Sequence, residues 1–431
     1  MEDVVAAIAE LKNVEVREIA GKRKGLVATM PIKAGTPILS EKPAVCFSAP
    51  ANKKFKNAGE PNFVLAKSLL SRPDADSVGF GLLNAYMPGH DPDHPIFQDR
   101  KDILDEDAQR LFQFLHPEAT AHPASDAPSQ PQPTENADGV EPLSLDDLRQ
   151  LLAVIHLNSF ALSSERFPGM TTYGFYLRMA FCNHSCRPNA CQYIDPNSTR
   201  ARLNSPSIVL RAVSDIAEGE EVCISYIELM DTTPERREAL QELYYFTCQC
   251  PRCERALPLH LPSSSPSAEK KTKADDATAT ATAGDGEEEG SLALETRVVE
   301  EFRATLQAAN DKAKAKDMKG SMLAWGRCAE LGERIYPSNW PTMATLYKHA
   351  HTAAKAAGAN PFVLEAWKQR FNEARRKCRG PQCAACNCFL TGPLLCGRCR
   401  QVAYCSSECQ RQHWKAAHKR ECKPPAKVPD N

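Results

Sequence analysis

The sequence predicts an α+β protein with a β-rich N-terminal part, a helical segment near the C-terminus and a small zinc-bound terminal module. Short β-type runs separated by turn residues occupy residues 14–46 and return between residues 191 and 228. From Leu292 to Arg376 the apolar residues recur at helical spacing. Between Cys383 and Cys422 the cysteines stand in closely spaced pairs, which is typical of zinc sites.

The bulk composition limits the classes of protein that this chain can be. At 431 residues it exceeds what one hydrophobic core usually supports, so two or three domains are expected. The start lacks an apolar signal region, and no apolar run approaches the length of a membrane span. We therefore expect a protein of the nucleus or cytoplasm with no membrane partner. We also expect it to be a monomer. The 18 cysteines in that reducing setting favour metal binding over disulfides. A net charge of -1 gives no global attraction to nucleic acid, which stays possible but unsupported.

The first predicted domain covers residues 14–254 and contains an insert at residues 48–142. Its start reads as a small antiparallel meander, and the insert predicts helices at Phe63–Leu70 and Asp105–Leu115. Residues 117–142 are rich in Pro, Ala, Ser and Gln and are expected to be a disordered loop. A helix is then predicted to begin at Ser144 as N-cap, with Asp147 completing a capping box, followed by strands at CQYI, SIVLRAV and EEVCISYIE.

The second half of the chain divides into three predicted parts. Residues 255–291 are a low-complexity linker with a Ser-rich run and repeated Ala-Thr. Residues 292–378 predict three or four antiparallel helices, with break signals near Gly320, Pro337 and Gly358. Residues 383–422 form the predicted zinc module.

The C-terminal cysteine and histidine spacing supplies eight ligands for two tetrahedral sites. The pairs are Cys383-x2-Cys386, Cys396-x2-Cys399, Cys405-x3-Cys409 and His418-x3-Cys422. The segment resembles the MYND finger, and the resemblance implies interleaved sites: Cys383, Cys386, Cys405 and Cys409 on one zinc, and Cys396, Cys399, His418 and Cys422 on the other. Two saturated sites leave no position for catalysis, so the finger is expected to be structural. The resemblance implies that it recognises another protein, typically through a Pro-rich peptide. His413 is expected at the surface.

A second cysteine group, Cys248-x-Cys250-x2-Cys253, supplies only three zinc ligands, and Cys186 is the best candidate for the fourth. Cys186 lies in the run NHSCxPN, which resembles the signature of SET-domain methyltransferases. The pieces GKRKGL and GEEVCISY stand in the same order as in that family. Together with the finger, they resemble the SET and MYND domain family. The resemblance implies a SET fold, three zinc ions, S-adenosyl-L-methionine as cofactor and a lysine of a histone or non-histone protein as methyl acceptor.

The same resemblance assigns roles to individual residues. Tyr226, at the end of GEEVCISY, would be the catalytic tyrosine beside the transferring methyl group and part of the cofactor site. Tyr244 and Phe160 would line the channel for the substrate lysine. The remaining predicted cofactor-binding residues are Lys22, Lys24, Gly25, Asn158, Asn183, His184 and Phe246.

The layout also differs from the typical family pattern, because the finger stands last here and the insert contains no cysteine between Ser48 and His116. Two other functions remain open at this point. A SET fold without activity could act as a scaffold that recruits partners through the finger. A nucleic-acid binder is disfavoured by the neutral total charge and by the absence of a base-reading motif.

Overall fold

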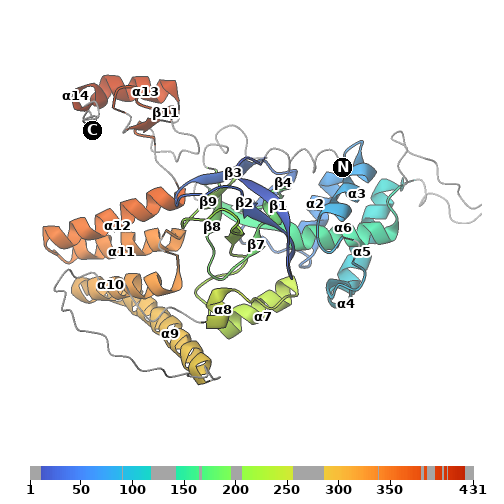
Figure 1. Ribbon diagram of the computed structural model, residues 1–431, viewed down its shortest axis with the longest axis horizontal. Coiled ribbons are helices and arrows are strands. Elements are labelled where there is room, and N and C mark those ends of the chain that lie inside the picture. Colours follow the sequence, from blue (N-terminus) through green and yellow to red (C-terminus); the bar gives the residue numbers. More distant parts are fainter. Residues whose placement is uncertain are drawn as a thin grey trace, which may run out of the picture.

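The strands of the protein lie between two sets of helices (Figure 1). The computed structural model describes residues 11–89, 91–117, 142–164, 167–195, 206–255, 286–337, 339–379, 383–385, 394–399, 402–404 and 406–422. Almost all of the loop predicted at residues 117–142 and most of the linker predicted at residues 255–291 lie outside these ranges.

The N-terminal strands do not form the predicted meander. β1 (Val14–Ile19) and β2 (Arg23–Ala28) make an antiparallel hairpin, whose turn uses Gly21 at a φ of 74°. β3 (Pro37–Glu41) and β4 (Val45–Pro50), however, leave the hairpin and join two different sheets. The meander prediction is therefore wrong beyond the hairpin, because strand partners are chosen by long-range packing rather than by proximity in sequence.

Two three-stranded antiparallel sheets and one short parallel pair complete the β structure. One sheet has the order β3-β9-β8, with β8 at Ala190–Ile194 and β9 at Ile208–Ala212. The other has the order β4-β6-β5, with β5 at Ser159–Ser164 and β6 at Phe167–Phe175. The parallel pair is β7 (Asn183–His184) with β10 (Cys223–Ile224). This pair brings together the two sequence runs that carried the SET resemblance.

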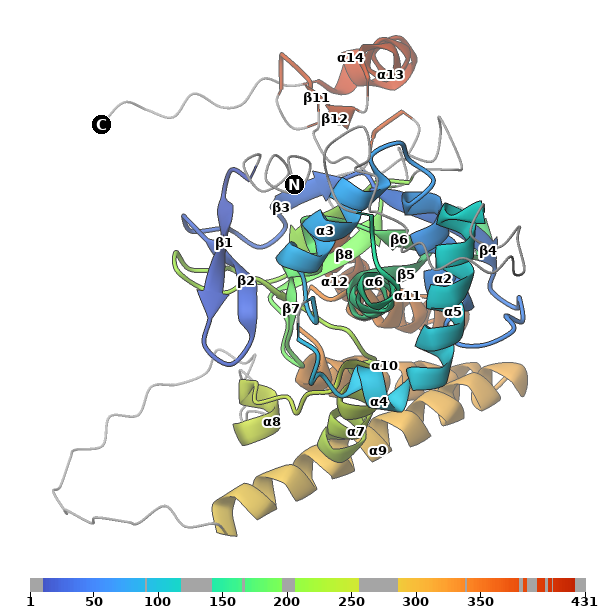
Figure 2. The same cartoon turned by 90° about the vertical axis from the view of Figure 1, so that its right-hand side faces the viewer.

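The insert and the following segment form the helices on one side of the strands. They are α2 (Glu60–Leu69), α3 (Ala75–Ala85), α4 (Ile96–Asp99), α5 (Lys101–Leu115) and α6 (Leu145–Asn158). A single turn of 3-10 helix, η2 (Met179–Phe181), precedes β7. The predicted capping box at Ser144 and Asp147 is confirmed, and the apolar stripe of α6 is fully buried in the core. α6 is the central helix of this side, since it packs against α2, α3 and α5 (Figure 2).

The C-terminal helical segment covers the opposite side. α9 (Gly286–Lys314) begins inside the predicted linker and is followed by α10 (Met318–Ile335), α11 (Pro341–Ala356) and α12 (Pro361–Arg379). Two shorter helices, α7 (Thr233–Tyr244) and α8 (Pro251–Arg255), lie between this segment and the strands. Val299 and Phe302 of α9 belong to the same hydrophobic cluster as Cys186 and Cys248, and α9 contacts α8, which carries Cys253.

The finger stands apart from the other elements in both views (Figures 1 and 2). Its elements are β11 (Leu394–Leu395), β12 (Ala403–Tyr404), α13 (Ser407–His413), η4 (Trp414–His418) and α14 (Lys419–Glu421). Among the helices that the structure describes, none combines the length and the apolar character that crossing a membrane requires.

Candidate functional site

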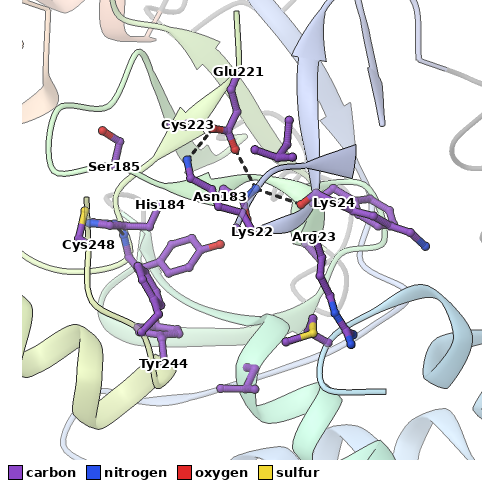
Figure 3. Close-up of a pocket in the computed structure, with 18 of the residues that line it drawn as sticks. Lys22, Arg23, Lys24, Asn183, His184, Ser185, Glu221, Cys223, Tyr244 and Cys248 are labelled. Atoms are coloured by element: carbon purple, nitrogen blue, oxygen red, sulfur yellow. Dashed lines mark hydrogen bonds and ion pairs between the residues drawn. The ribbon is translucent and has the colours of Figure 1, made fainter. Parts of the chain in front are cut away.

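A cavity of about 1330 Å³ opens where the β1–β2 hairpin, the β7–β10 pair, the insert and the cysteine group meet. The predicted residues on its wall are Lys22, Lys24, Asn158, Asn183, His184, Tyr226, Tyr244 and Phe246. Figure 3 shows several of them converging from different elements on one space. Gly25 and Phe160 are absent from the lining.

A polar network built on Asn183 forms one wall of this cavity. The parallel pairing of β7 with β10 sets Asn183 opposite Cys223, near Glu221. The Asn183 side-chain amide donates to the Lys24 carbonyl at 3.0 Å and to the Glu221 carboxylate at 2.8 Å (Figure 3). Lys22 Nζ donates to the same carboxylate at 2.6 Å. Because both amide hydrogens of Asn183 are used internally, its oxygen is the atom left to accept a hydrogen bond from a ligand.

Gly25 allows this network to form rather than lining the cavity. A Cβ at this position would lie 2.7 Å from Asn183 Nδ2 and 3.0 Å from Glu221 Oε1. Any larger residue would therefore push the amide and the carboxylate away from strand β2. The structure thus gives Gly25 a packing role beside the cavity, and its contact with a cofactor stays a prediction.

Tyr226 follows β10 directly and its hydroxyl is anchored to the backbone. The hydroxyl donates to the Cys182 carbonyl at 2.6 Å, and burial raises the pKa of Tyr226 well above its usual value. A phenol has one hydrogen to donate and two lone pairs to accept with. With the hydrogen committed to Cys182, the Tyr226 oxygen can act towards a ligand only as an acceptor.

His184 connects Tyr226 to the cysteine group. The backbone N–H of Tyr226 donates to His184 Nδ1 at 3.0 Å, and His184 Nε2 lies 3.2 Å from Cys186 Sγ. Burial lowers the pKa of His184 to about 4, so the ring is neutral at pH 7. Since Nδ1 must accept, the ring hydrogen sits on Nε2 and points at the sulfur.

An aromatic wall forms where α7 ends. The ring centroids of Tyr226 and Tyr244 are 4.8 Å apart, and those of His184 and Phe246 are 6.1 Å apart. Between Tyr244 and Phe246, Tyr245 caps α7 in the left-handed conformation, with φ 62°, and its hydroxyl donates to Asp99 at 2.6 Å.

Phe160, the other predicted channel residue, lies on β5 and packs edge-on against Tyr176 at 5.9 Å. Its side chain belongs to the packing around the core rather than to the cavity wall.

The insert supplies part of the cavity that the sequence did not reveal. Met87 and His94 line the cavity, and the side-chain amide of Asn158 donates to the Met87 carbonyl at 2.7 Å and to the Val154 carbonyl at 2.8 Å. Like Asn183, Asn158 therefore offers only its oxygen to a ligand. Lys24 Nζ reaches the Ala85 carbonyl at 3.5 Å.

Other lining residues missed by sequence reasoning are Arg23, Glu221, Cys223 and Tyr245. Glu221 and Cys223 lie inside the run GEEVCISY, so the residues neighbouring Tyr226 in sequence were the available signal.

The four cysteines of the first predicted zinc site come together beside the cavity. The sulfurs of Cys186, Cys248, Cys250 and Cys253 all lie within 4.8 Å of one another. The Cys186–Cys248 and Cys186–Cys253 sulfur separations are 3.9 and 3.5 Å. Tetrahedral zinc with Zn–S bonds of about 2.3 Å requires sulfurs about 3.8 Å apart. The donor set and spacing therefore fit one zinc ion, and Cys248 and Cys250 also line the cavity.

One of the two predicted finger sites is also assembled. Cys396, Cys399, His418 and Cys422 bring their ligand atoms within 4.8 Å, with Cys396 and Cys422 sulfurs 3.8 Å apart, which again fits zinc. In the other set, Cys386 and Cys405 lie outside the described residues, whereas Cys383 is buried and Cys409 half-buried.

His413, predicted at the surface, is half-buried instead. Its ring stacks on His418 with centroids 5.6 Å apart, and its Nδ1 lies 3.1 Å from the Tyr404 hydroxyl. His413 therefore lies beside the assembled ligand set and stacks on its member His418.

Two family models match the chain. The SET domain model matches residues 23–227, and the MYND finger model matches residues 383–422. The first range contains the hairpin strand β2, the insert and the β7–β10 pair with Tyr226. The second contains the whole predicted finger.

Several curated proteins resemble part of the chain. "Histone-lysine N-methyltransferase Smyd1" of Mus musculus is 34% identical over 119 residues, covering 26% of this chain and 24% of that protein. "Histone-lysine N-methyltransferase SMYD3" of Mus musculus is 36% identical over 108 residues, covering 25% and 23%. "N-lysine methyltransferase SMYD2" of Homo sapiens is 34% identical over 108 residues, with the same coverage. The match thus spans about a quarter of the length of these relatives.

A solved structure titled "Crystal structure of the SET domain of LSMT bound to Lysine and AdoHcy" is 13% identical, with a TM-score of 0.34, covering 88% of this chain and 92% of that chain. The two family models together place a SET domain at residues 23–227 and a MYND finger at residues 383–422 of this chain.

Proposed function

We propose that this protein is an S-adenosyl-L-methionine-dependent protein-lysine N-methyltransferase. The observation that carries the proposal is Tyr226, whose hydroxyl hydrogen is committed to the Cys182 carbonyl in a cavity lined by two fixed amides. The similarity to curated lysine methyltransferases supports the same activity. The acceptor class is a lysine of a histone or non-histone protein.

The polar wall suits the amino-acid end of the cofactor. The oxygens of Asn183 and Asn158 would accept hydrogen bonds from its ammonium group, because both amides have their hydrogens engaged elsewhere. Lys22 and Lys24 would attract its carboxylate, and Phe246 would stack on its adenine ring.

When bound, S-adenosyl-L-methionine supplies an electrophilic methyl group on a positively charged sulfur. The chain's task is to align the lysine nitrogen with that methyl group and to exclude water, since transfer is an in-line displacement. Tyr226, accepting from the amine through its free lone pairs, would fix the direction of approach. The aromatic wall of Tyr226 and Tyr244 disfavours the lysine ammonium form by desolvation, which helps to supply the neutral amine.

We also propose three zinc ions, one in the four-cysteine cluster and two in the finger. The ligand spacing of the two described sets supports two of these ions. The finger would bind a peptide or protein, and its exposed apolar strand residues Leu394 and Leu395 support that role.

Transfer of a labelled methyl group tests the enzymatic proposal. The full chain would be incubated with tritium-labelled S-adenosyl-L-methionine and a protein extract, and the modified residues identified by mass spectrometry. We expect label on lysine side chains of particular proteins, and about 10² to 10³ times slower labelling with Tyr226→Phe. A chain that binds no S-adenosyl-L-methionine by calorimetry contradicts the proposal and favours a recruiting scaffold.

A further inference from the structure

A buried charge network joins the C-terminal helical segment to the four-cysteine cluster. Glu295 of α9 is fully buried, and so is Arg236 of α7, while Arg252 of α8 is 3% exposed. One Glu295 oxygen, Oε1, forms an ion pair with Arg236 Nη1 at 3.0 Å and accepts a hydrogen bond from Arg252 Nε at 2.9 Å. The other oxygen, Oε2, accepts from the Thr233 hydroxyl. Both carboxylate oxygens are therefore engaged inside the protein.

The far ends of the two arginines reach the cysteine cluster. Arg236 Nη2 lies 3.9 Å from Cys253 Sγ, and Arg252 Nη1 donates to the Cys186 carbonyl at 3.4 Å. Arg252 Nη2 is buried and has no hydrogen-bond partner within the part of the chain that the structure describes. A buried N–H of a guanidinium without an acceptor is costly unless an anion stands nearby.

The charge of a four-cysteine zinc site explains this arrangement. Four thiolates and one Zn²⁺ together carry a net charge of about -2, and such a charge is expensive to bury without compensation. Arg236 and Arg252 supply two positive charges next to the cluster. Those two guanidinium groups would repel each other in the interior, and the Glu295 carboxylate between them removes that repulsion.

The same cluster is continuous with the cavity wall. Cys186, Cys248 and Cys253 share one hydrophobic cluster with Val299 and Phe302 of α9. The wall aromatics Tyr226, Tyr244 and Phe246 pack against this cluster. A shift of the cysteines would therefore move the aromatic wall.

We propose that Glu295 is a positioning residue that, through Arg236 and Arg252, ties the helical segment to the cysteine cluster and so holds the aromatic wall of the cofactor cavity in place. The inference depends on the proposed zinc and cofactor. On this proposal, the C-terminal helical segment supports the cofactor cavity and is not an independent domain.

Glu295→Gln tests the inference, because it removes the charge and keeps the shape. The matched control is Glu301→Gln on the same helix, where the carboxylate pairs with Arg327 at the surface. The first readout is the rate of cysteine alkylation, mapped residue by residue by mass spectrometry on the full zinc-loaded chain. The second is the calorimetric affinity for S-adenosyl-L-methionine.

Loss of a group that orients metal ligands typically weakens metal binding about 10- to 100-fold, so for Glu295→Gln we expect alkylation of Cys186, Cys248, Cys250 and Cys253 to become faster by about that factor. The finger cysteines should keep their wild-type rate. Cofactor affinity should fall about tenfold. Glu301→Gln should leave both quantities within twofold.

Equal alkylation rates and affinities in folded Glu295→Gln and Glu301→Gln overturn the inference. If Glu295→Gln gives no folded protein, Arg252→Gln replaces it, because that variant keeps the Arg236–Glu295 pair, and it should show the same selective alkylation with a smaller factor. Wild-type protein that binds no S-adenosyl-L-methionine defeats the proposed function, yet the alkylation comparison still decides the role of Glu295.

Discussion

The two cysteine-rich regions of this protein use the same ligand chemistry in different surroundings. The cluster of Cys186, Cys248, Cys250 and Cys253 touches buried arginines, a long helix and the cavity wall. Cys396, Cys399 and Cys422 of the finger set belong to a hydrophobic cluster whose described members all come from the finger itself. We infer from this comparison that ligand spacing marks a candidate metal site, whereas the packing around it decides whether the bound metal would also support the cavity.

The largest effect is expected from Tyr226→Phe, which removes the aromatic-wall hydroxyl that is bonded to the Cys182 carbonyl. Losing one oriented polar group in an active site typically costs about 10² to 10³ in rate. Methyl transfer should fall by that factor, while calorimetric affinity for the cofactor stays within about threefold.

Tyr347→Phe is the matched control, because its hydroxyl donates to Glu333 at 2.9 Å in the helical segment, outside the cavity lining. It should keep wild-type turnover. A Tyr226→Phe variant with wild-type turnover would remove Tyr226 from the mechanism.

The pH dependence of methyl transfer should report on the cavity, where the substrate lysine must lose its proton. The fraction of neutral lysine rises about tenfold per pH unit below the lysine pKa, so the rate with saturating cofactor should rise with pH between 6 and 8. Burial raises the pKa of Tyr226, so the phenol stays protonated and adds no falling limb in this range. Initial rates at five pH values measure this slope. A bell-shaped profile centred near pH 7 would show that another group must stay protonated.

A substitution in the finger should change the zinc content of the finger and leave the four-cysteine cluster loaded. Elemental analysis of protein never exposed to chelators should give about three zinc ions per chain. Cys396→Ser should lose finger zinc without changing cofactor affinity. Two or fewer zinc ions in the wild type, with reactive Cys186 and Cys248, would count against the cluster beside the cavity.

The sequence predicted the local features well and the long-range ones poorly. The capping box at Ser144, one of the two predicted ligand sets of the finger and the strand at SIVLRAV depend on nearby residues, and each appears in the structure. The pairing of β3 with β9 depends on packing between segments far apart in the chain, so the predicted meander failed.

The same distinction applies to the candidate site. Tyr226, Asn183 and His184 belong to contiguous runs and line one cavity. Glu221 reaches the cavity wall through the pairing of β7 with β10, and Met87 reaches it through the fold of the insert. Neither arrangement can be predicted from neighbouring residues. The charge network at Glu295 joins residues 43 and 59 positions apart across the linker, and no local pattern marks it.

Titration of S-adenosyl-L-methionine into two variants tests the contrast between the regions most directly. One variant lacks residues 380–431, and the other carries Cys250→Ser in the full chain. The account predicts that the first binds the cofactor within about threefold of the wild type, and that the second loses at least about tenfold, or 1.4 kcal/mol. Retained affinity in Cys250→Ser together with a loss beyond tenfold on removing the finger would contradict it.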